Sequence, residues 1–197
     1  MLLSLTTSCG KDEAVPPSEQ NGNQNGQGGN NQEGSTAPII VTVDADGNAD
    51  GGHRFVKIDD TNFYIDDIKY TATKGDLVVT GYNHAFFKGE ATIISQLNYV
   101  GREMHVIEIG WDAFSRCTGL TFVTIPSSVT SIGMFAFVNS TALTDVYCYA
   151  EMVPNTDSYT FYESPISNAT LHVPASAIDA YRNTSPWSGF GKIEVIQ

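Results

Sequence analysis

The sequence predicts a mainly β fold: a solenoid of about three to four short coils with a β-hairpin cap at its N-terminal end and a second cap at its C-terminal end. Two observations support this class. The stretch IGWDAF at 109–114 returns as IGMFAF at 132–137, so a unit of 23 residues is repeated. Short β-forming runs separated by turn residues occupy most of the chain after residue 37. A repeated unit that cannot bury its own apolar edge has to stack on its neighbour.

The first nine residues, MLLSLTTSC, are a short apolar segment followed by small residues and Cys9. They resemble the end of a bacterial lipoprotein signal, in which the cysteine becomes the lipidated N-terminus. The apolar region is short, Thr6 replaces the usual leucine, and no Lys or Arg precedes it, so we expect the natural start codon to lie further upstream. The alternative is a signal-peptide remnant or a disordered start whose cysteine is incidental.

The charged residues that follow Cys9 and Gly10 look like the surface-export signal of Bacteroidetes lipoproteins. They are Lys11, Asp12 and Glu13. This resemblance implies a domain outside the cell, held in the outer membrane by its acyl chains. Residues 10–37 are rich in Gly, Asn and Gln and have little to bury, so we expect a disordered tether spanning about 30 Å. Because no apolar run reaches the roughly 20 residues of a transmembrane helix, lipid is the only membrane attachment that we expect.

The N-terminal cap is expected to consist of short strands. Residues 38–60 predict a strand pair around a Gly/Asp turn, which either joins the cap or packs separately. Residues 61–108 predict the cap and the first coil, in which ATIISQL at 91–97 is a degenerate repeat. Hairpin turns are predicted at Lys74-Gly75, Lys88-Gly89 and Gly101-Arg102.

Residues 109–174 are predicted to form the repeats, because their apolar positions recur with the spacing L-x-x-V-x-I of a leucine-rich repeat. Strand alternation turns Val123 and Ile125 inward, and does the same for Val146 and Cys148 in the next unit. The paired positions are Ile109 with Ile132, Gly110 with Gly133, Ala113 with Ala136, Phe114 with Phe137, Thr118 with Thr141, Leu120 with Leu143, Val123 with Val146 and Ile125 with Cys148.

The stretch LTFVTIPSSVTSIGMFAFVNSTALTDVYCYA resembles the BspA-like leucine-rich-repeat surface proteins, whose units read approximately C-x-x-L-x-x-V-x-I-P-x-x-V-x-x-I-G-x-x-A-F. A looser third unit, with Leu171 and Val173, follows an irregular loop at 151–167. Residues 175–197 resemble the C-terminal cap of this family, with Ile193 and Val195 as its last inward-facing pair.

Other packing positions follow from the same register. Gly133 is expected to permit a tight bend, and Ala136 and Phe137 to pack in the edge beyond it. Cys117 and Cys148 fall at non-equivalent points of successive units, so we expect buried thiols and no disulfide between them.

Candidates for metal binding and catalysis are weak. DADGNADGG at 44–52 alternates oxygen ligands, but Ala49 replaces the turn glycine of a calcium loop and Phe55 its closing glutamate, so a solvated turn is the better interpretation. The four histidines have no metal-ligand spacing, and no catalytic motif occurs. We therefore expect no cofactor, no metal and no enzymatic activity.

The outward side chains of the strands are the candidate binding face. Stacking should align Phe122, Asp145, Thr170 and Lys192 in one column and Thr124, Tyr147, His172 and Glu194 in the next. An ordinary exposed sheet is the alternative. The residues predicted to form the face are Phe122, Thr124, Asp145, Tyr147, Tyr149, Thr170 and His172.

The formal charge of −12 disfavours nucleic acid as a partner. The family resemblance implies adhesion to an extracellular protein, such as a host matrix or cell-surface protein. A glycan-binding surface lipoprotein of a nutrient-uptake system is the alternative, for which exposed aromatic platforms would be decisive. Trp111 and Trp187 are the candidates for such platforms, although packing is the expected role of both.

Overall fold

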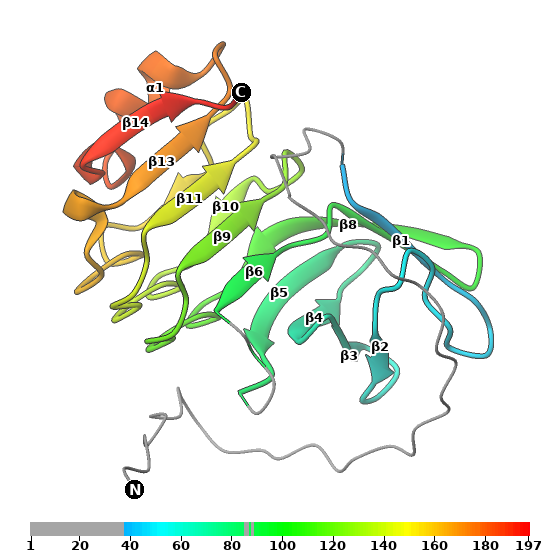
Figure 1. Ribbon diagram of the computed structural model, residues 1–197. Helices are drawn as coiled ribbons and strands as arrows, with labels where there is room; N and C mark the ends of the chain where they lie inside the picture. Colours follow the sequence, from blue (N-terminus) through cyan, green and yellow to red (C-terminus); the bar gives the residue numbers. More distant parts are fainter. Residues whose placement is uncertain (1–37, 85–86, 88) are drawn as a thin grey trace, which may run out of the picture.

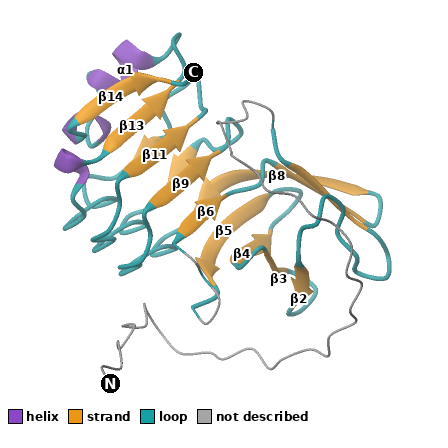
Figure 2. Cartoon of the chain, viewed as in Figure 1, coloured by secondary structure: helices purple, strands orange, loops and turns teal. Residues whose placement is uncertain are grey.

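The computed structural model describes residues 38–84, 87 and 89–197, and it confirms the predicted β solenoid with a cap at each end. Figure 1 shows the strands of the repeats lying side by side in a regular row that ends at the C-terminus. The antiparallel N-terminal strands form a separate layer at the other end of this row. Figure 2 shows that the helical segments gather at the C-terminal end.

The first sheet combines the N-terminal cap with the back wall of the solenoid. Its main path runs in the order β1-β7-β8-β5-β4-β3-β2, and β10 and β12 extend it from β8. Strand β8 joins the two parts, because it pairs antiparallel with β7 and parallel with β5 and β10. The strands are β1 (Ile40–Val43), β2 (Phe55–Lys57), β3 (Asn62–Ile65), β4 (Ile68–Ala72), β5 (Leu77–Tyr82), β7 (Gln96–Tyr99), β8 (Arg102–Ile109), β10 (Ser131–Ile132) and β12 (Asn155–Thr156).

The second sheet is fully parallel and forms the front wall. Its order is β14-β13-β11-β9-β6, so each coil adds one strand beside the previous one. Three short helical segments, η1 (Ile166–Asn168), α1 (Ile178–Arg182) and η2 (Trp187–Gly189), lie in the last part of the chain. The strands are β6 (Glu90–Thr92), β9 (Phe122–Ile125), β11 (Asp145–Cys148), β13 (Thr170–Val173) and β14 (Lys192–Val195).

The two strands predicted at 38–60 are present, but they do not pair with each other as predicted. Strand β1 pairs parallel with β7, whereas β2 pairs antiparallel with β3 at the far end of the sheet. The predicted hairpins at Lys74-Gly75 and Gly101-Arg102 are confirmed by the β4–β5 and β7–β8 pairs. The hairpin at Lys88-Gly89 is wrong, because Gly89 leads into β6, which pairs parallel with β9 in the other sheet.

The turns at 111–116 and 134–139 form one edge of the solenoid, which we call the turn edge. The loop predicted to be irregular at 151–167 contains a third copy of this turn, at 158–163. Thr160 and Phe161 take the places of Ala136 and Phe137, since the amide of Phe137 donates to the carbonyl of Thr160 (2.9 Å) as that of Phe114 does to Ala136 (2.7 Å). Two paired serines repeat as well. The Ser140 hydroxyl donates to the Phe114 carbonyl (3.0 Å), and the Ser164 hydroxyl donates to the Phe137 carbonyl. Each serine therefore bonds to the phenylalanine of the preceding unit.

The core between the walls contains a stack of aromatic rings. Phe114 and Phe137 are parallel within 1° with their centroids 5.4 Å apart, and Phe161 continues the stack from Phe137 at 5.2 Å. Tyr82 extends it toward the cap at 5.8 Å from Phe114. Trp187 is buried and meets Phe161 edge-on, at 69°, where the stack ends. One ring per coil therefore fills the same place in successive coils, which explains the repetition of phenylalanine.

Three packing predictions have different outcomes. Gly133 is required by a close approach rather than by a bend, because a Cβ atom on it would lie 2.6 Å from the amide nitrogen of Trp111. Cys117 and Cys148 are buried thiols, as predicted. Val195 pairs with Val173 in register, but it is 40% exposed, so it does not supply the predicted inward-facing side chain.

Candidate functional site

The front sheet presents the predicted candidate face in two aligned columns. The pairing register places Phe122 beside Asp145, Asp145 beside Thr170, and Thr170 beside Lys192. In the second column Thr124 lies beside Tyr147, Tyr147 beside His172, and His172 beside Glu194. The alternation of the strands turns these residues away from the buried core. We call this surface the strand face.

Three rings of the strand face lie in contact across neighbouring strands. Phe122 and Tyr147 have centroids 5.0 Å apart, and Tyr147 stacks on His172 at 4.0 Å with an angle of 12°. The Nε2 atom of His172 lies 3.0 Å from a carboxylate oxygen of Asp145, which fixes the imidazole ring on the sheet. The rings are half-buried and held by a hydrogen-bonded sheet, so they offer apolar area with little conformational freedom to lose.

Burial and neighbouring carboxylates raise the pKa values of the tyrosines on the strand face. Partial burial raises the pKa of Tyr147, and the neighbouring carboxylates of Asp145 and Glu194 raise it further. Burial also raises the pKa of Tyr149, followed by a contribution from Tyr147. Both phenols therefore remain neutral near pH 7. They can donate a hydrogen bond there, whereas Asp145 and Glu194 accept.

The strand face extends by one strand beyond the predicted residues. Strand β6 pairs with β9, which places Glu90 beside Phe122 and Thr92 beside Thr124. The signal was present in the sequence, since ATIISQL matches the alternation of the later strands. Tyr149 follows β11, and its amide donates to the carbonyl of Ile125 (3.0 Å), so it borders the end of the second column.

The other candidate groups serve local structure. One carboxylate oxygen of Asp44 accepts the amides of Asp46 and Asn48, each at 2.9 Å, and the Asn48 side chain is the main cause of the lowered pKa of Asp44. His53 pairs with Asp66. Across the described residues, no group of three or more His, Cys, Asp or Glu side chains is arranged to hold a metal ion.

The two tryptophans differ from one another. Trp187 is buried in the core, as predicted. The expected packing role of Trp111 is wrong, because its side chain is 63% exposed. The repeat gave a signal for this exposure: the equivalent residue of the next unit is Met134, which is also exposed, whereas the buried positions around it are the same in both copies.

The residues predicted for lipidation and export, Cys9, Lys11, Asp12 and Glu13, lie outside the described residues, as does the predicted tether at 10–37. Within the part of the chain that the structure describes, no helix has the length and apolar character needed to cross a membrane.

Two solved structures are similar to this chain. A leucine-rich repeat protein from Bacteroides capillosus ATCC 29799 is 21% identical, covers 69% of this chain and 99% of its own, and has a TM-score of 0.48. A leucine rich cell surface protein from Faecalibacterium prausnitzii A2-165 is 18% identical with a TM-score of 0.45, and covers 70% of this chain and 43% of its own. A search of curated proteins found no match.

A family model gives the decisive comparison. The model described as a BspA type leucine rich repeat region, with six copies, matches residues 83–184. This match contains the strands β6, β9, β11 and β13 and all three copies of the turn edge. The chain therefore belongs to the BspA-type leucine-rich-repeat family.

Proposed function

We propose that this chain is a non-enzymatic surface lipoprotein whose strand face binds an extracellular protein. Proteins of the leucine-rich-repeat family commonly act in protein interaction, and the strand face has the composition of an interaction surface. The observation that carries the proposal is the row of contacting rings, Phe122, Tyr147 and His172, on a parallel sheet. Aromatic groups held in place are the residues that dominate protein interfaces.

The chemistry of the strand face supports binding rather than catalysis. His172 and Asp145 form a pair that could orient an imidazole for base catalysis. Among the described residues, however, no Ser, Thr or Cys side chain is hydrogen-bonded to His172 as a nucleophile would be. Asp145 lies beside His172 and Glu194 beside Lys192, so the strand face offers groups of both charges to complementary side chains of a partner, such as a host matrix or neighbouring-cell protein.

The binding test uses the full chain with purified matrix proteins immobilised on a biosensor. We expect saturable binding to at least one of them and a loss of at least tenfold in affinity for Tyr147→Ala and Phe122→Ala. Met152→Ala is the matched control, because Met152 is 86% exposed and is not part of the strand face. Equal binding by Tyr147→Ala and the unmodified chain would reject the strand face as the contact surface.

The proposed address is the outer membrane, with acyl chains on Cys9 and export directed by Lys11, Asp12 and Glu13. This part of the proposal rests on the resemblance of residues 1–13 to lipoprotein signals. Cys9→Ser should release the protein from the membrane fraction. Protease treatment of intact cells should remove the domain, and its protection until lysis would contradict the surface location.

A further inference from the structure

A groove of about 830 Å³ lies between the N-terminal sheet and the turns of the repeats. Its floor on the cap side comes from β3, β4 and β5, and its other side comes from the turns that follow β8 and β10 and from the turn of the third copy. It shares no lining residue with the strand face. Its size is in the range of small-ligand sites. The lining residues include Lys69, Trp111, Asp112, Arg116, Phe135 and Tyr162.

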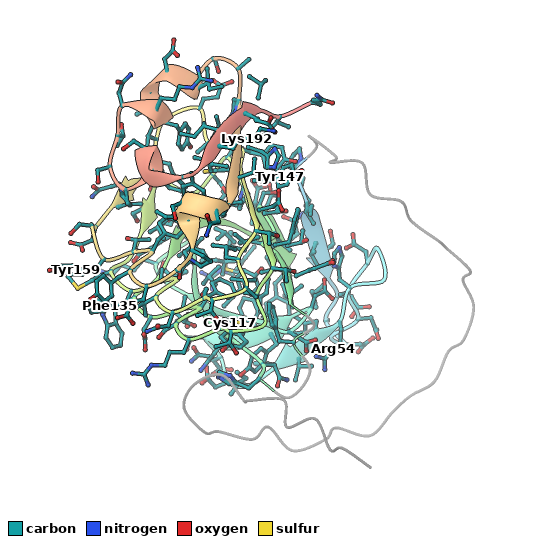
Figure 3. All side chains as sticks on the ribbon, turned by 60° about the vertical axis from the view of Figure 1, so that its left-hand side comes forward. Arg54, Cys117, Phe135, Tyr147, Tyr159 and Lys192 are labelled. Carbon is teal, nitrogen blue, oxygen red and sulfur yellow. The ribbon has the colours of Figure 1, made fainter. Side chains whose placement is uncertain are left out.

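The groove is bordered by exposed aromatic rings on a rigid edge. Trp111 is 63% exposed and Tyr162 is 51% exposed, and both line the groove. Phe135 also lines it and contacts Tyr159 at 5.8 Å, and Tyr159 meets Tyr162 edge-on at 5.7 Å. Figure 3 shows Phe135 and Tyr159 together at one edge of the molecule, away from Tyr147 and Lys192 on the strand face. Exposed aromatic groups gathered in this way indicate a binding surface.

The backbone at Phe135 supports a role for its ring outside the core. Phe135 has a φ of 61°, in the left-handed region that bulky residues rarely adopt. The equivalent residue of the previous unit, Asp112, has a φ of 62°. The repeated turn imposes this conformation on both units, and Phe135 adopts it at a cost in strain where Asp112 tolerates it. Because the ring is only half-buried, core packing does not account for its presence.

Side chains of both charges stand beside the rings. Lys69, Arg116 and Asp112 line the groove together with the amide of Asn139, so hydrogen-bond donors and acceptors are present without an excess of acid. This balance differs from that of the chain as a whole, whose formal charge is −12. The strongly acidic chain would repel a polyanion, whereas an uncharged ligand meets no such barrier.

At two places the turn edge offers no backbone donor to a peptide strand. The amide of Arg116 donates to the carbonyl of Val138 (2.6 Å), and the amide of Asn139 donates to that of Tyr162 (3.0 Å). A peptide that binds as an added strand needs unpaired backbone groups. Recognition here therefore depends on ring faces and polar side chains. This combination fits a ligand that has apolar C–H faces and many hydroxyl groups.

We propose that the groove binds a neutral oligosaccharide, with a sugar ring packed on Trp111 and hydroxyl groups bonded by Asp112, Arg116 and Lys69. Aromatic rings attract C–H groups at their faces, and the adjacent ionic side chains give charge-assisted hydrogen bonds to hydroxyls. This site is independent of the strand face, so either proposal can fail without the other.

The test begins with the full chain on an array of neutral and anionic glycans, beside an array of peptides. We expect neutral glycans to be retained, and the best of them is then titrated by calorimetry and by tryptophan fluorescence. The chain has two tryptophans, of which Trp187 is buried, so a change of emission on binding is assigned to Trp111.

Variants separate the groove from the rest of the surface. Trp111→Ala should weaken glycan binding at least tenfold and Trp111→Phe by less, whereas Met152→Ala should leave it unchanged. Tyr162→Ala provides a second variant, and circular dichroism checks that each protein is folded. Retention of no glycan, retention of anionic glycans or peptides alone, or equal binding by Trp111→Ala and the unmodified chain would each overturn the proposal.

Discussion

The strand face and the turn edge are built by the same 23-residue units, yet they use aromatic side chains differently. Inside the turn edge, successive units keep one residue type, and Phe114, Phe137 and Phe161 stack in a buried row. On the strand face, the units differ, and Thr124, Tyr147 and His172 occupy equivalent places. Positions that agree between units therefore meet the needs of packing, whereas those that differ are available for recognition.

The largest effect is expected from the inner row. Phe137→Ala removes a buried ring that contacts Phe114 and Phe161, so the free energy of unfolding should fall by about 3–5 kcal/mol. Denaturation in urea measures the change. The matched control is Phe135→Ala, two residues away, which removes the same side chain from a half-buried site. Similar losses for both variants would show that the inner and outer rings are not distinct.

The next largest effect is a loss of stability at high pH that is caused by Cys148, a buried residue of β11. Burial raises the pKa of Cys148 to about 11, from 9.0 for an ordinary cysteine. Above pH 9 the unfolded chain loses this proton while the folded chain keeps it. The contribution of this thiol to the free energy of unfolding is therefore fully present below pH 9. It decreases by about 2 kcal/mol as the pH rises to 11.

The measurement compares urea unfolding at pH 8 and pH 11 under reducing conditions. Tyr70 and Tyr181 also have pKa values raised by burial, so the total loss exceeds that of the cysteine alone. Cys148→Ala should show a smaller loss over this interval than the unmodified chain. An identical pH dependence in the two proteins would contradict the assignment to Cys148.

An effect of similar size is expected where two coils approach at Gly133. Gly133→Ala places a Cβ atom against the backbone of Gly110 and Trp111, and the resulting shift should cost about 1–3 kcal/mol. Gly119→Ala is the control, because its added Cβ would meet open space and its φ is not in the left-handed region. Thermal unfolding of the pair measures the difference. Equal melting temperatures would mean that the coils can separate freely at this point.

The smallest effect on stability is expected on the strand face. Tyr147→Ala removes ring contacts with Phe122 and His172, worth about 0.5–1.5 kcal/mol. The same variant should lose most of its protein binding. Thermal unfolding and biosensor affinity, measured on one preparation, test both statements. A large loss of stability would place Tyr147 among the packing residues and weaken the contrast between the two surfaces.

The sequence predicted the repeats well because their packing is local and periodic. The columns of the strand face followed from aligning the apolar positions of successive units and from strand alternation, although the units differ slightly in length. The third copy of the turn edge was missed because it retains only Phe161 and Ser164 of the recurring residues, and Thr160 replaces a small alanine. A period supported by so few positions is hard to separate from an irregular loop.

Features formed by distant segments were not predictable in this way. The partners of β1 and β2 lie far along the chain, and no local pattern selects β7 for one and β3 for the other. The groove beside Trp111 likewise needs the packing of the cap against the turns. Exposure of Trp111 could have been inferred because the next unit has a different residue, Met134, at the equivalent place. The residues of the cap that form the opposite wall of the groove could not have been inferred.

The edge-on ring of Trp187 limits how this solenoid can grow in evolution. Phe161 meets both Trp187 and Phe190 nearly at right angles, so a further parallel ring has no place beyond it. A duplicated unit inserted earlier, between Phe114 and Phe161, would find a parallel neighbour on each side. Length variation among close relatives should therefore arise from internal duplication, with the terminating tryptophan carried along unchanged.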